Sequence, residues 1–193
     1  MFELFEQYIK KTIPELTEDE IRLMESRCSV RKLRRKEFLL REGEICNEKA
    51  FVTKGLFRTF SVGENGAEHI LRFIDAGNWL IDPESYFKEQ PAKYNIDAIE
   101  PTQVVLFHRA DFHYLNEQIP HLGKYNQDLF KESVLTLQDQ LHMTISGTSE
   151  EKYLHFIETH PDIYQRIPLH MVASYLGLSR ETLTRIRQGM AGK

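Results

Sequence analysis

The spacing of apolar positions changes along this chain of 193 residues and divides it into regions. Near its start, Phe2, Phe5 and Ile9 recur every three or four positions, which is typical of an amphipathic helix. From Ser29 to Phe107, short apolar runs alternate with glycine or proline turns, a pattern typical of an all-β sandwich or barrel. From Ala110 onward the helical spacing returns. The pattern therefore predicts a β-domain with helices before and after it.

Local signals predict where several helices begin. Thr17 with Glu20 three residues later is a capping box, so a helix is expected to start there. Pro120 occupies the favoured first turn of a long helix that we expect to end at about residue 146. The polar stretch "SGTSEE" follows, and Ser149 within it is expected to cap the next helix. We place the domain boundary in this stretch.

The long helix carries an apolar seam at spacings of four, three and four, as in the a and d positions of a coiled coil. The seam consists of Phe130, Val134, Leu137 and Leu141. Either the β-domain of the same chain or a second copy of the helix could cover it. The apolar surface is wider than one small domain usually covers, so we expect both, on different faces. This predicts a dimerisation helix at about residues 120–146.

The segment "LHMVASYLGLSRETLTRIRQ" predicts two short helices joined by a tight turn, the arrangement of a helix-turn-helix. Gly177 can adopt the left-handed backbone of the turn, and Ser179 is expected to cap the second helix. Leu183 and Ile186 are expected to face inward. The outward residues suit the major groove of DNA because they offer donors and acceptors: Arg180, Glu181, Thr184, Arg185 and Gln188. An ordinary helical hairpin is the alternative.

Charge is unevenly distributed. The chain has a formal net charge of −4, which argues against general attraction to nucleic acid. From residue 179 onward, however, Arg180, Arg185, Arg187 and Lys193 stand against Glu181 alone, a local balance of +3. A local basic face is what a dedicated nucleic-acid-binding element needs, although a solvated basic helix would look the same.

Other sequence features lead us to expect a cytoplasmic protein. No apolar run is long enough for a membrane span, and the first residues lack the basic start and apolar core of a signal peptide. Cys28 and Cys46 are therefore expected to be free thiols, and two cysteines are too few for a four-thiolate iron–sulfur cluster.

Two stretches carry a family resemblance. "VASYLGL" with "SRETLTRI" resembles the helix-turn-helix of the cyclic-AMP receptor protein (Crp/Fnr) family of bacterial regulators. "LLREGEICNEKAFVTKGLFRTFSV" resembles the family's β-roll, including the Gly43-Glu44 turn and the Lys54-Gly55 corner. The long helix falls where the family has its dimer helix. The resemblance covers nearly the whole chain, in order.

The resemblance implies an α+β fold with an N-terminal double-stranded β-roll of the jelly-roll type, a long dimerisation helix and a C-terminal helix-turn-helix. The expected domains are residues 1–146 and 147–193. It implies a homodimer that binds operator DNA, responds to a small-molecule effector, contacts RNA polymerase and catalyses no reaction. By position, Arg180, Glu181 and Arg185 match base-reading residues, and Ser179 and Thr182 match residues that contact phosphate.

The chain departs from the family pattern in two places. The phosphate cassette of the family has a Gly-Glu pair and a later Arg-Ser or Arg-Thr, where this chain has Ile81-Asp82 and Tyr94-Asn95. A cyclic phosphate needs a buried cation or several amides, so we expect weak or no binding of cyclic AMP and leave the effector unknown. The candidate pocket residues are Arg72, Asp82, Lys93, Tyr94 and Asn95. Only "GMAGK" follows the second helix, where the family has a two-stranded wing, so a weaker grip on the DNA backbone is expected.

Two other classes of function stay open. A cupin-like β-barrel metalloenzyme would need metal ligands gathered from neighbouring strands, and His69 is the only histidine well inside the strand region. His108 and His113 could hold a metal or haem, although surface histidines are the simpler interpretation. No nucleophile elbow, zinc spacing or phosphate loop is present, and Asp82 and Asp97 are expected to be surface carboxylates. The third class is an interaction module without ligand and with a vestigial DNA domain.

Overall fold

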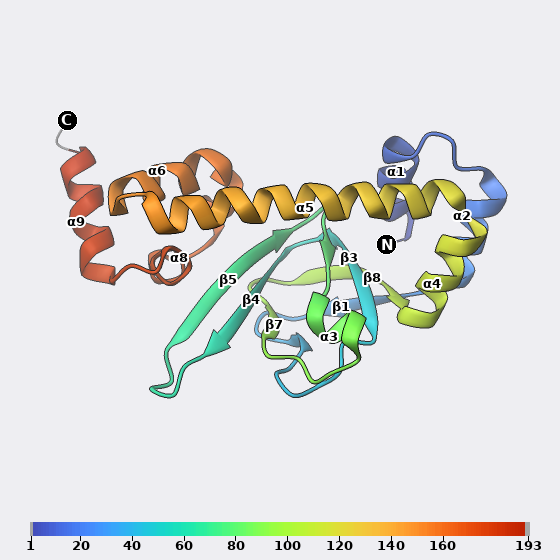
Figure 1. Ribbon diagram of the computed structural model, residues 1–193, viewed down its shortest axis with the longest axis horizontal. Coiled ribbons are helices and arrows are strands. Elements are labelled where there is room, and N and C mark those ends of the chain that lie inside the picture. Colours follow the sequence, from blue (N-terminus) through green and yellow to red (C-terminus); the bar gives the residue numbers. More distant parts are fainter. Residues whose placement is uncertain (1, 192–193) are drawn as a thin grey trace. The chain divides into compact units, whose positions relative to one another are not determined.

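The computed structural model describes residues 2–191, which follow the order of helices, strands and helices that the apolar spacing predicts (Figure 1). The first helices and strands are α1 (Phe2–Thr12), α2 (Glu18–Ser26), β1 (Cys28–Leu33), β2 (Phe38–Leu40), β3 (Glu48–Lys54), β4 (Leu56–Val62), β5 (Glu68–Asp75) and β6 (Trp79–Leu80). The remaining elements are α3 (Pro83–Lys88), β7 (Asn95–Ala98), β8 (Thr102–His108), α4 (Arg109–Gln118), α5 (Pro120–Ser146), α6 (Ser149–Thr159), α7 (Pro161–Arg166), α8 (Leu169–Leu176) and α9 (Arg180–Ala191).

The strands form two four-stranded sheets, with the orders β1-β8-β3-β6 and β2-β7-β4-β5. Strand β8 pairs antiparallel with both β1 and β3, so Val105 lies opposite Val30 on one side and Phe51 on the other. Apart from the β4–β5 hairpin, the neighbours in these sheets are not consecutive in the sequence, as expected for a jelly roll. The predicted fold class is confirmed.

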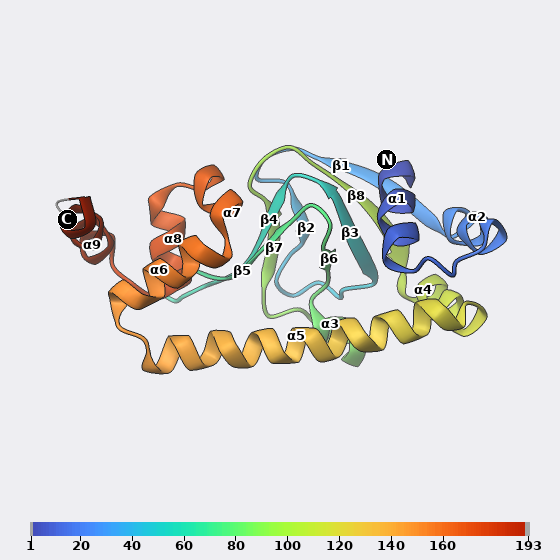
Figure 2. The same ribbon diagram turned by 90° about the horizontal axis from the view of Figure 1, so that it is seen from above.

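Two apolar clusters stabilise the β-roll. The first joins α1, α2, α4 and the start of α5 to the β8 sheet, with Phe5, Phe51 and Phe107 at no more than 1% exposed. The second fills the space between the two sheets and includes Leu40 and Ile96. Figure 2 shows α1, α2 and α4 grouped at one end of the β-roll. Burying aromatic and aliphatic side chains on both faces of one sheet fixes its position between the helices and the second sheet.

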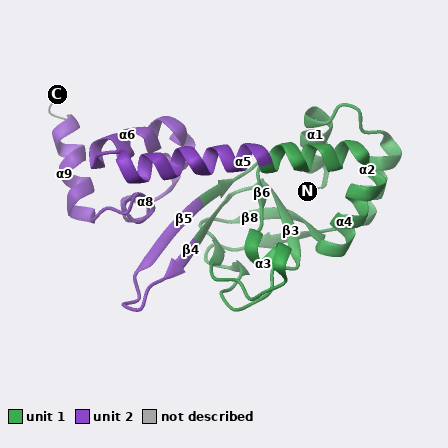
Figure 3. Cartoon of the chain, viewed as in Figure 1, with its two compact units in different colours: residues 1–59, 73–130 green, residues 60–72, 131–193 purple. Residues whose placement is uncertain are grey.

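The chain divides into two compact units (Figure 3): residues 1–59 with 73–130, and residues 60–72 with 131–193. The first unit holds most of the β-roll, and the second holds the C-terminal helices together with the tip of the β4–β5 hairpin. Helix α5 contributes its first part to one unit and its remainder to the other.

Most predicted helix boundaries are confirmed, with one correction. Helix α2 has the capping box of Thr17 and Glu20, and α5 runs from Pro120 to Ser146. The expected cap at Ser149 is wrong, because Thr148 caps α6. The Thr148 hydroxyl accepts a hydrogen bond from the Glu151 amide at 3.3 Å, and the Thr148 amide donates to the Glu151 carboxylate at 2.8 Å. Glu151 stands three residues after Thr148, and this reciprocal pairing decides where the helix begins.

Within residues 2–191, no helix combines the length and the apolar character needed to cross a membrane.

Candidate nucleic-acid interface and ligand pocket

The turn between α8 and α9 has the geometry that the sequence predicts. Gly177 has φ of +66°, a backbone angle that residues with a Cβ rarely adopt. The Leu178 amide donates to the Ala173 carbonyl at 2.9 Å, which closes the end of α8. Ser179 then caps α9, because its hydroxyl accepts the Thr182 amide at 3.1 Å. The two helices are thus joined by a short, fully hydrogen-bonded turn.

The inner face of this helix pair is apolar. Val172, Ala173 and Leu183 are at most 2% exposed, and Phe156 of α6 lies among the buried residues of the same unit. Ile186 is partly buried. Burial of these side chains fixes the roll of α9, and therefore which of its residues face solvent.

The outer face of α9 presents the residues predicted to meet DNA. The exposed members of this set are Ser179, Arg180, Glu181, Thr184, Arg185 and Gln188. Thr182 is partly buried, and its hydroxyl lies 3.0 Å from that of Ser179. The backbone amide of Glu181 itself, the Ser179 hydroxyl and the Arg180 charge lower the pKa of the Glu181 carboxyl. Glu181 is therefore an anion at neutral pH and can only accept hydrogen bonds.

One basic residue of this region has a different role. Arg187 hydrogen-bonds the Tyr153 hydroxyl on α6. Burial and the neighbouring Tyr164 raise the pKa of Tyr153 to about 12, and Arg187 acts in the opposite direction. Arg187 itself remains exposed. One of the positive charges expected at this end of the chain, that of Arg187, therefore has a partner within its own unit. Helix α9 extends to Ala191, so the first residues of "GMAGK" are helical, and Lys193 lies outside the described residues.

Helix α8 is held by two polar contacts that the sequence did not predict. The Ser174 hydroxyl donates to the Glu68 carbonyl at 2.6 Å and accepts from the Ile70 amide at 3.1 Å, so it pairs with the edge strand β5. The Gln140 side chain on α5 donates to the Tyr175 hydroxyl at 2.9 Å. These contacts join α8 to both the β4–β5 hairpin and α5. They link residues up to 106 positions apart, so no local sequence signal identifies them.

The predicted seam of α5 faces solvent in the single chain. The exposed fractions are 61% for Phe130, 47% for Val134, 53% for Leu137 and 58% for Leu141. Ile145, one turn further on, is 76% exposed. Exposed apolar side chains in a continuous row indicate a surface that another molecule covers.

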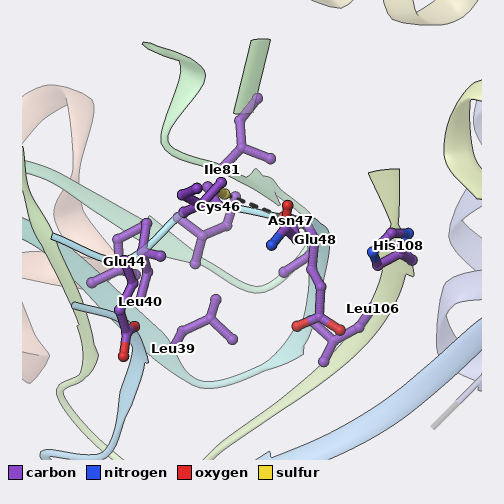
Figure 4. Close-up of a pocket in the computed structure, with 13 residues that line it drawn as sticks. Leu39, Leu40, Glu44, Cys46, Asn47, Glu48, Ile81, Leu106 and His108 are labelled. Atoms are coloured by element: carbon purple, nitrogen blue, oxygen red, sulfur yellow. Dashed lines mark hydrogen bonds between the residues drawn. The ribbon is translucent and has the colours of Figure 1, made fainter. Parts of the chain in front are cut away.

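A cavity of about 400 Å³ opens into the β-roll (Figure 4). Its apolar lining comes from strands of both sheets and from the loop before β3: Leu39, Leu40, Ile45, Cys46, Ala50, Leu80, Ile81, Ile96 and Leu106. Its polar lining consists of Glu44, Asn47, Glu48 and His108. A concave, mostly apolar cavity with a few polar groups is the usual form of a small-molecule site.

Comparison with known proteins agrees with this architecture. Residues 30–118 match the family described as the cyclic nucleotide-binding domain. The transcriptional activator protein Anr of Pseudomonas aeruginosa is 27% identical over 173 residues, which cover 81% of this chain and 68% of Anr. The structure of FixK2 from Bradyrhizobium japonicum matches with a TM-score of 0.74 at 16% identity, over 86% of this chain and 85% of FixK2. A Crp/Fnr regulator from Eubacterium rectale matches with a TM-score of 0.72 at 14% identity, over 92% of this chain and 85% of that structure.

The resemblance to the Crp/Fnr family is confirmed. The chain has the Crp/Fnr fold, and residues 30–118 are the part that matches the cyclic nucleotide-binding domain.

Within this Crp/Fnr fold, the residues predicted for the effector pocket do not line the observed cavity. The Asp82 carboxylate caps α3 by accepting the Ser85 amide at 2.9 Å. The exposed Lys93 pairs with Glu84 at 2.7 Å, and the Asn95 side chain accepts the Glu42 amide at 3.1 Å. Tyr94 is partly buried, whereas Arg72 belongs to the other compact unit. The polar groups of this region therefore serve the local structure, and their binding of an effector stays a prediction.

A buried ion pair inside the Crp/Fnr β-roll was missed from the sequence. Arg58 on β4 and Asp97 on β7 are 7% and 4% exposed, with their side chains joined at 2.8 and 3.1 Å. The expectation that Asp82 and Asp97 are surface carboxylates is wrong, since both are at most 4% exposed. Arg58 is a buried cation of the kind a cyclic phosphate requires, but it is already paired with a carboxylate in a two-point contact.

The two histidines considered for metal or haem have other contacts. Nδ1 of His108 accepts the Ala110 amide at 3.3 Å and so caps α4. His113 is exposed and lies 3.3 Å from Glu117. Across the part of the chain that the structure describes, no three potential metal-ligating side chains come together.

Proposed function

We propose that this protein is a Crp/Fnr-type transcription regulator that binds operator DNA as a homodimer. The observation that carries the proposal is the outer face of α9, where the exposed Arg180, Glu181 and Arg185 extend from a capped and packed helix. Anr, with which the chain shares 27% identity, is named a transcriptional activator. The protein would act by binding alone, without catalysis, in the cytoplasm, and RNA polymerase would be its partner at promoters.

Dimerisation would use the seam of α5. Phe130, Val134, Leu137 and Leu141 repeat at a and d positions, and each is at least 47% exposed. A parallel pair of these helices around a two-fold axis would bury the same row on both chains. Such an axis would also present two copies of α9 to the two halves of a palindromic operator.

Base reading would start at the beginning of α9. Arg180 and Arg185 lie five residues apart, which turns them by about 140° in projection at about 100° per residue. They therefore cannot contact the same base edge, but with Glu181 between them they can meet successive base pairs. Ser179 and Thr182 lie at the N-terminus of α9, where the helix dipole favours an anion, so their hydroxyls are suited to a phosphate.

Effector control would pass through the contacts of α8. The Ser174 hydroxyl is hydrogen-bonded to the β4–β5 hairpin, and Gln140 of α5 is bonded to Tyr175. An effector that favours one arrangement of α5 or of the hairpin would therefore also favour one arrangement of α8 and α9. This would be a population shift between two states that differ in the separation of the recognition helices.

A binding-site selection with double-stranded DNA tests the base-reading assignment. Replacing Arg180→Ala or Arg185→Ala should cost about 1–3 kcal/mol on the selected operator and relax the preference at one base pair. Thr182→Ala should weaken all sequences about equally, because a phosphate contact carries no base information. Arg35→Ala removes an equal charge from an exposed position outside the helix-turn-helix and is the control. Arginine variants that lose affinity but keep the wild-type sequence preference would show that these arginines contact phosphates.

A further inference from the structure

Five aliphatic side chains of the core between the two sheets contribute to the lining of the β-roll cavity. Leu40, Ala50, Leu80, Ile96 and Leu106 line it, and each is at most 6% exposed. Walls of this composition offer dispersion contacts and almost no hydrogen bonds. They therefore favour a hydrocarbon group over a sugar or a phosphate.

The mouth of the cavity is acidic. Glu44 and Glu48 line it and are exposed, and no lysine or arginine is among its lining residues. Glu48 lies opposite His108 in the β3–β8 register, and Figure 4 shows both side chains among the lining residues. The Glu44 carboxylate also accepts the Arg41 amide at 2.8 Å. Two carboxylates with no lysine or arginine in the lining disfavour an anion and favour a cation.

The cations near the cavity in the sequence have partners of their own. Arg41 follows the lining residue Leu40, and its guanidinium lies over the Phe38 ring, 3.8 Å from the ring centroid. Lys49 follows Glu48 on the strand and so points to the opposite face, where its amine donates to Asn126 at 2.7 Å. Arg109 bonds Asn47 and Glu89, and Arg58 bonds Asp97. Nδ1 of His108 accepts the Ala110 amide at 3.3 Å. None of these groups offsets the two carboxylates at the mouth.

We infer that the cavity binds an organic cation with an apolar body, of the alkylammonium or arylammonium class. The hydrocarbon would lie against Leu40, Ile96 and Leu106, and the ammonium would lie between Glu44 and Glu48. This inference deepens the proposed function, because the bound cation would be the effector of the regulator.

Calorimetry at pH 7 with three probes of equal chain length tests the site: octylammonium, 1-octanol and octanoate. We expect octylammonium to bind at least 10-fold more tightly than octanoate, with 1-octanol between them. Glu48→Gln should weaken octylammonium binding several-fold and leave 1-octanol unchanged. Glu42→Gln removes the same charge from an exposed position in the preceding β2–β3 loop that does not line the cavity, and it should change neither affinity. Leu39→Trp fills the cavity from a partly buried position and should abolish binding of both probes, with circular dichroism confirming the fold.

Several results would overturn the inference. These are equal affinity for octylammonium and octanoate, equal losses in Glu48→Gln and Glu42→Gln, undiminished binding by Leu39→Trp, or no binding of any probe. A separate titration with the selected operator keeps the two proposals distinct. A protein that binds operator but none of the probes refutes the cation site alone. A protein that binds octylammonium as described but no DNA sequence refutes the proposed function alone.

Discussion

The two parts of α5 have similar apolar spacing but opposite surroundings. In the first part Leu122 is fully buried in the aromatic core of the β-roll, whereas beyond it Leu137 and Ile145 are 53% and 76% exposed. Helical spacing therefore predicts that an apolar stripe exists but not what covers it. The covered part shows what the fold itself buries. The uncovered part is the surface that we assign to a second copy of the chain.

The polar contacts of the two parts of α5 also differ. In the first part, the Asn126 side chain donates to Asn116 at 2.7 Å and accepts the Lys49 amine at 2.7 Å, while the Tyr125 hydroxyl lies 3.3 Å from the Trp79 ring nitrogen. In the second part, Thr136 and Thr144 donate to carbonyls of their own helix, and Gln140 donates to the Tyr175 hydroxyl of α8 at 2.9 Å. The first part is anchored to the β-roll by side chains, and most of the second part is anchored by its own backbone.

The largest expected contrast is between two leucine truncations. Leu122→Ala removes a side chain with no exposed surface and should lower the free energy of unfolding by about 2–5 kcal/mol, the usual cost of a cavity in a core. Leu135→Ala removes a side chain that is 61% exposed and lies off the seam, so its effect should stay below about 0.5 kcal/mol. Denaturant unfolding at one protein concentration measures both. Equal effects would mean that the covered and uncovered parts of α5 do not differ as described.

A smaller loss is expected at Asn126. Asn126→Ala should lower the free energy of unfolding by about 1–3 kcal/mol, because the Lys49 amine and the Asn116 side chain each lose a partner. Gln127→Ala, at the neighbouring exposed position, is the control and should be neutral. If both variants unfold at the same denaturant concentration as wild type, the polar anchor contributes nothing to stability.

The third expected effect is a change in the free energy of unfolding with pH. Burial lowers the pKa of Lys49 to about 7, from the ordinary value of 10.5 that it regains on unfolding. Between these two pKa values the unfolded chain binds more protons at this amine than the folded chain does. The part of the free energy of unfolding that depends on Lys49 is therefore highest above about pH 10.5, and it is lost as the pH falls through about 7. The slope is at most about 1.4 kcal/mol per pH unit. The centroids of the Trp79 and Phe112 rings lie 4.5 and 4.3 Å from the amine. They favour the charged amine and so reduce the slope.

Comparing wild type with Lys49→Met separates the pH dependence due to Lys49 from that of the other titratable groups. The difference in unfolding free energy between wild type and Lys49→Met should shift in favour of wild type from pH 7 to pH 10. Parallel stability curves over this range would show that the Lys49 amine is charged in the folded protein throughout.

Features fixed by neighbouring residues were predictable from the sequence. The limits of α5, the left-handed Gly177 and the Ser179 cap each depend on residues within one or two turns, and the structure contains all three. The choice between Thr148 and Ser149 as a cap failed although the signal is local. Both are good caps alone, and only the position of Glu151 separates them.

Features that depend on strand pairing were not predictable. Arg58 and Asp97 are 39 residues apart and meet because β4 and β7 are neighbours in the sheet. The cavity is assembled from five strands and two loops, so no spacing in the sequence identifies its lining. The cassette around Tyr94 and Asn95 indicated only that the usual phosphate site had changed.

The most direct test of the account is the mass of the protein in solution, measured by sedimentation equilibrium at micromolar concentration. We predict that wild type sediments as two chains of 22.8 kDa each. Leu137→Glu, which puts a charge into the seam of both chains, should sediment as one chain. Leu135→Glu makes the same substitution two residues away on another face and should remain a dimer. A monomeric wild type, or equal dissociation of the two variants, would contradict the claim that the seam of α5 is the dimer interface.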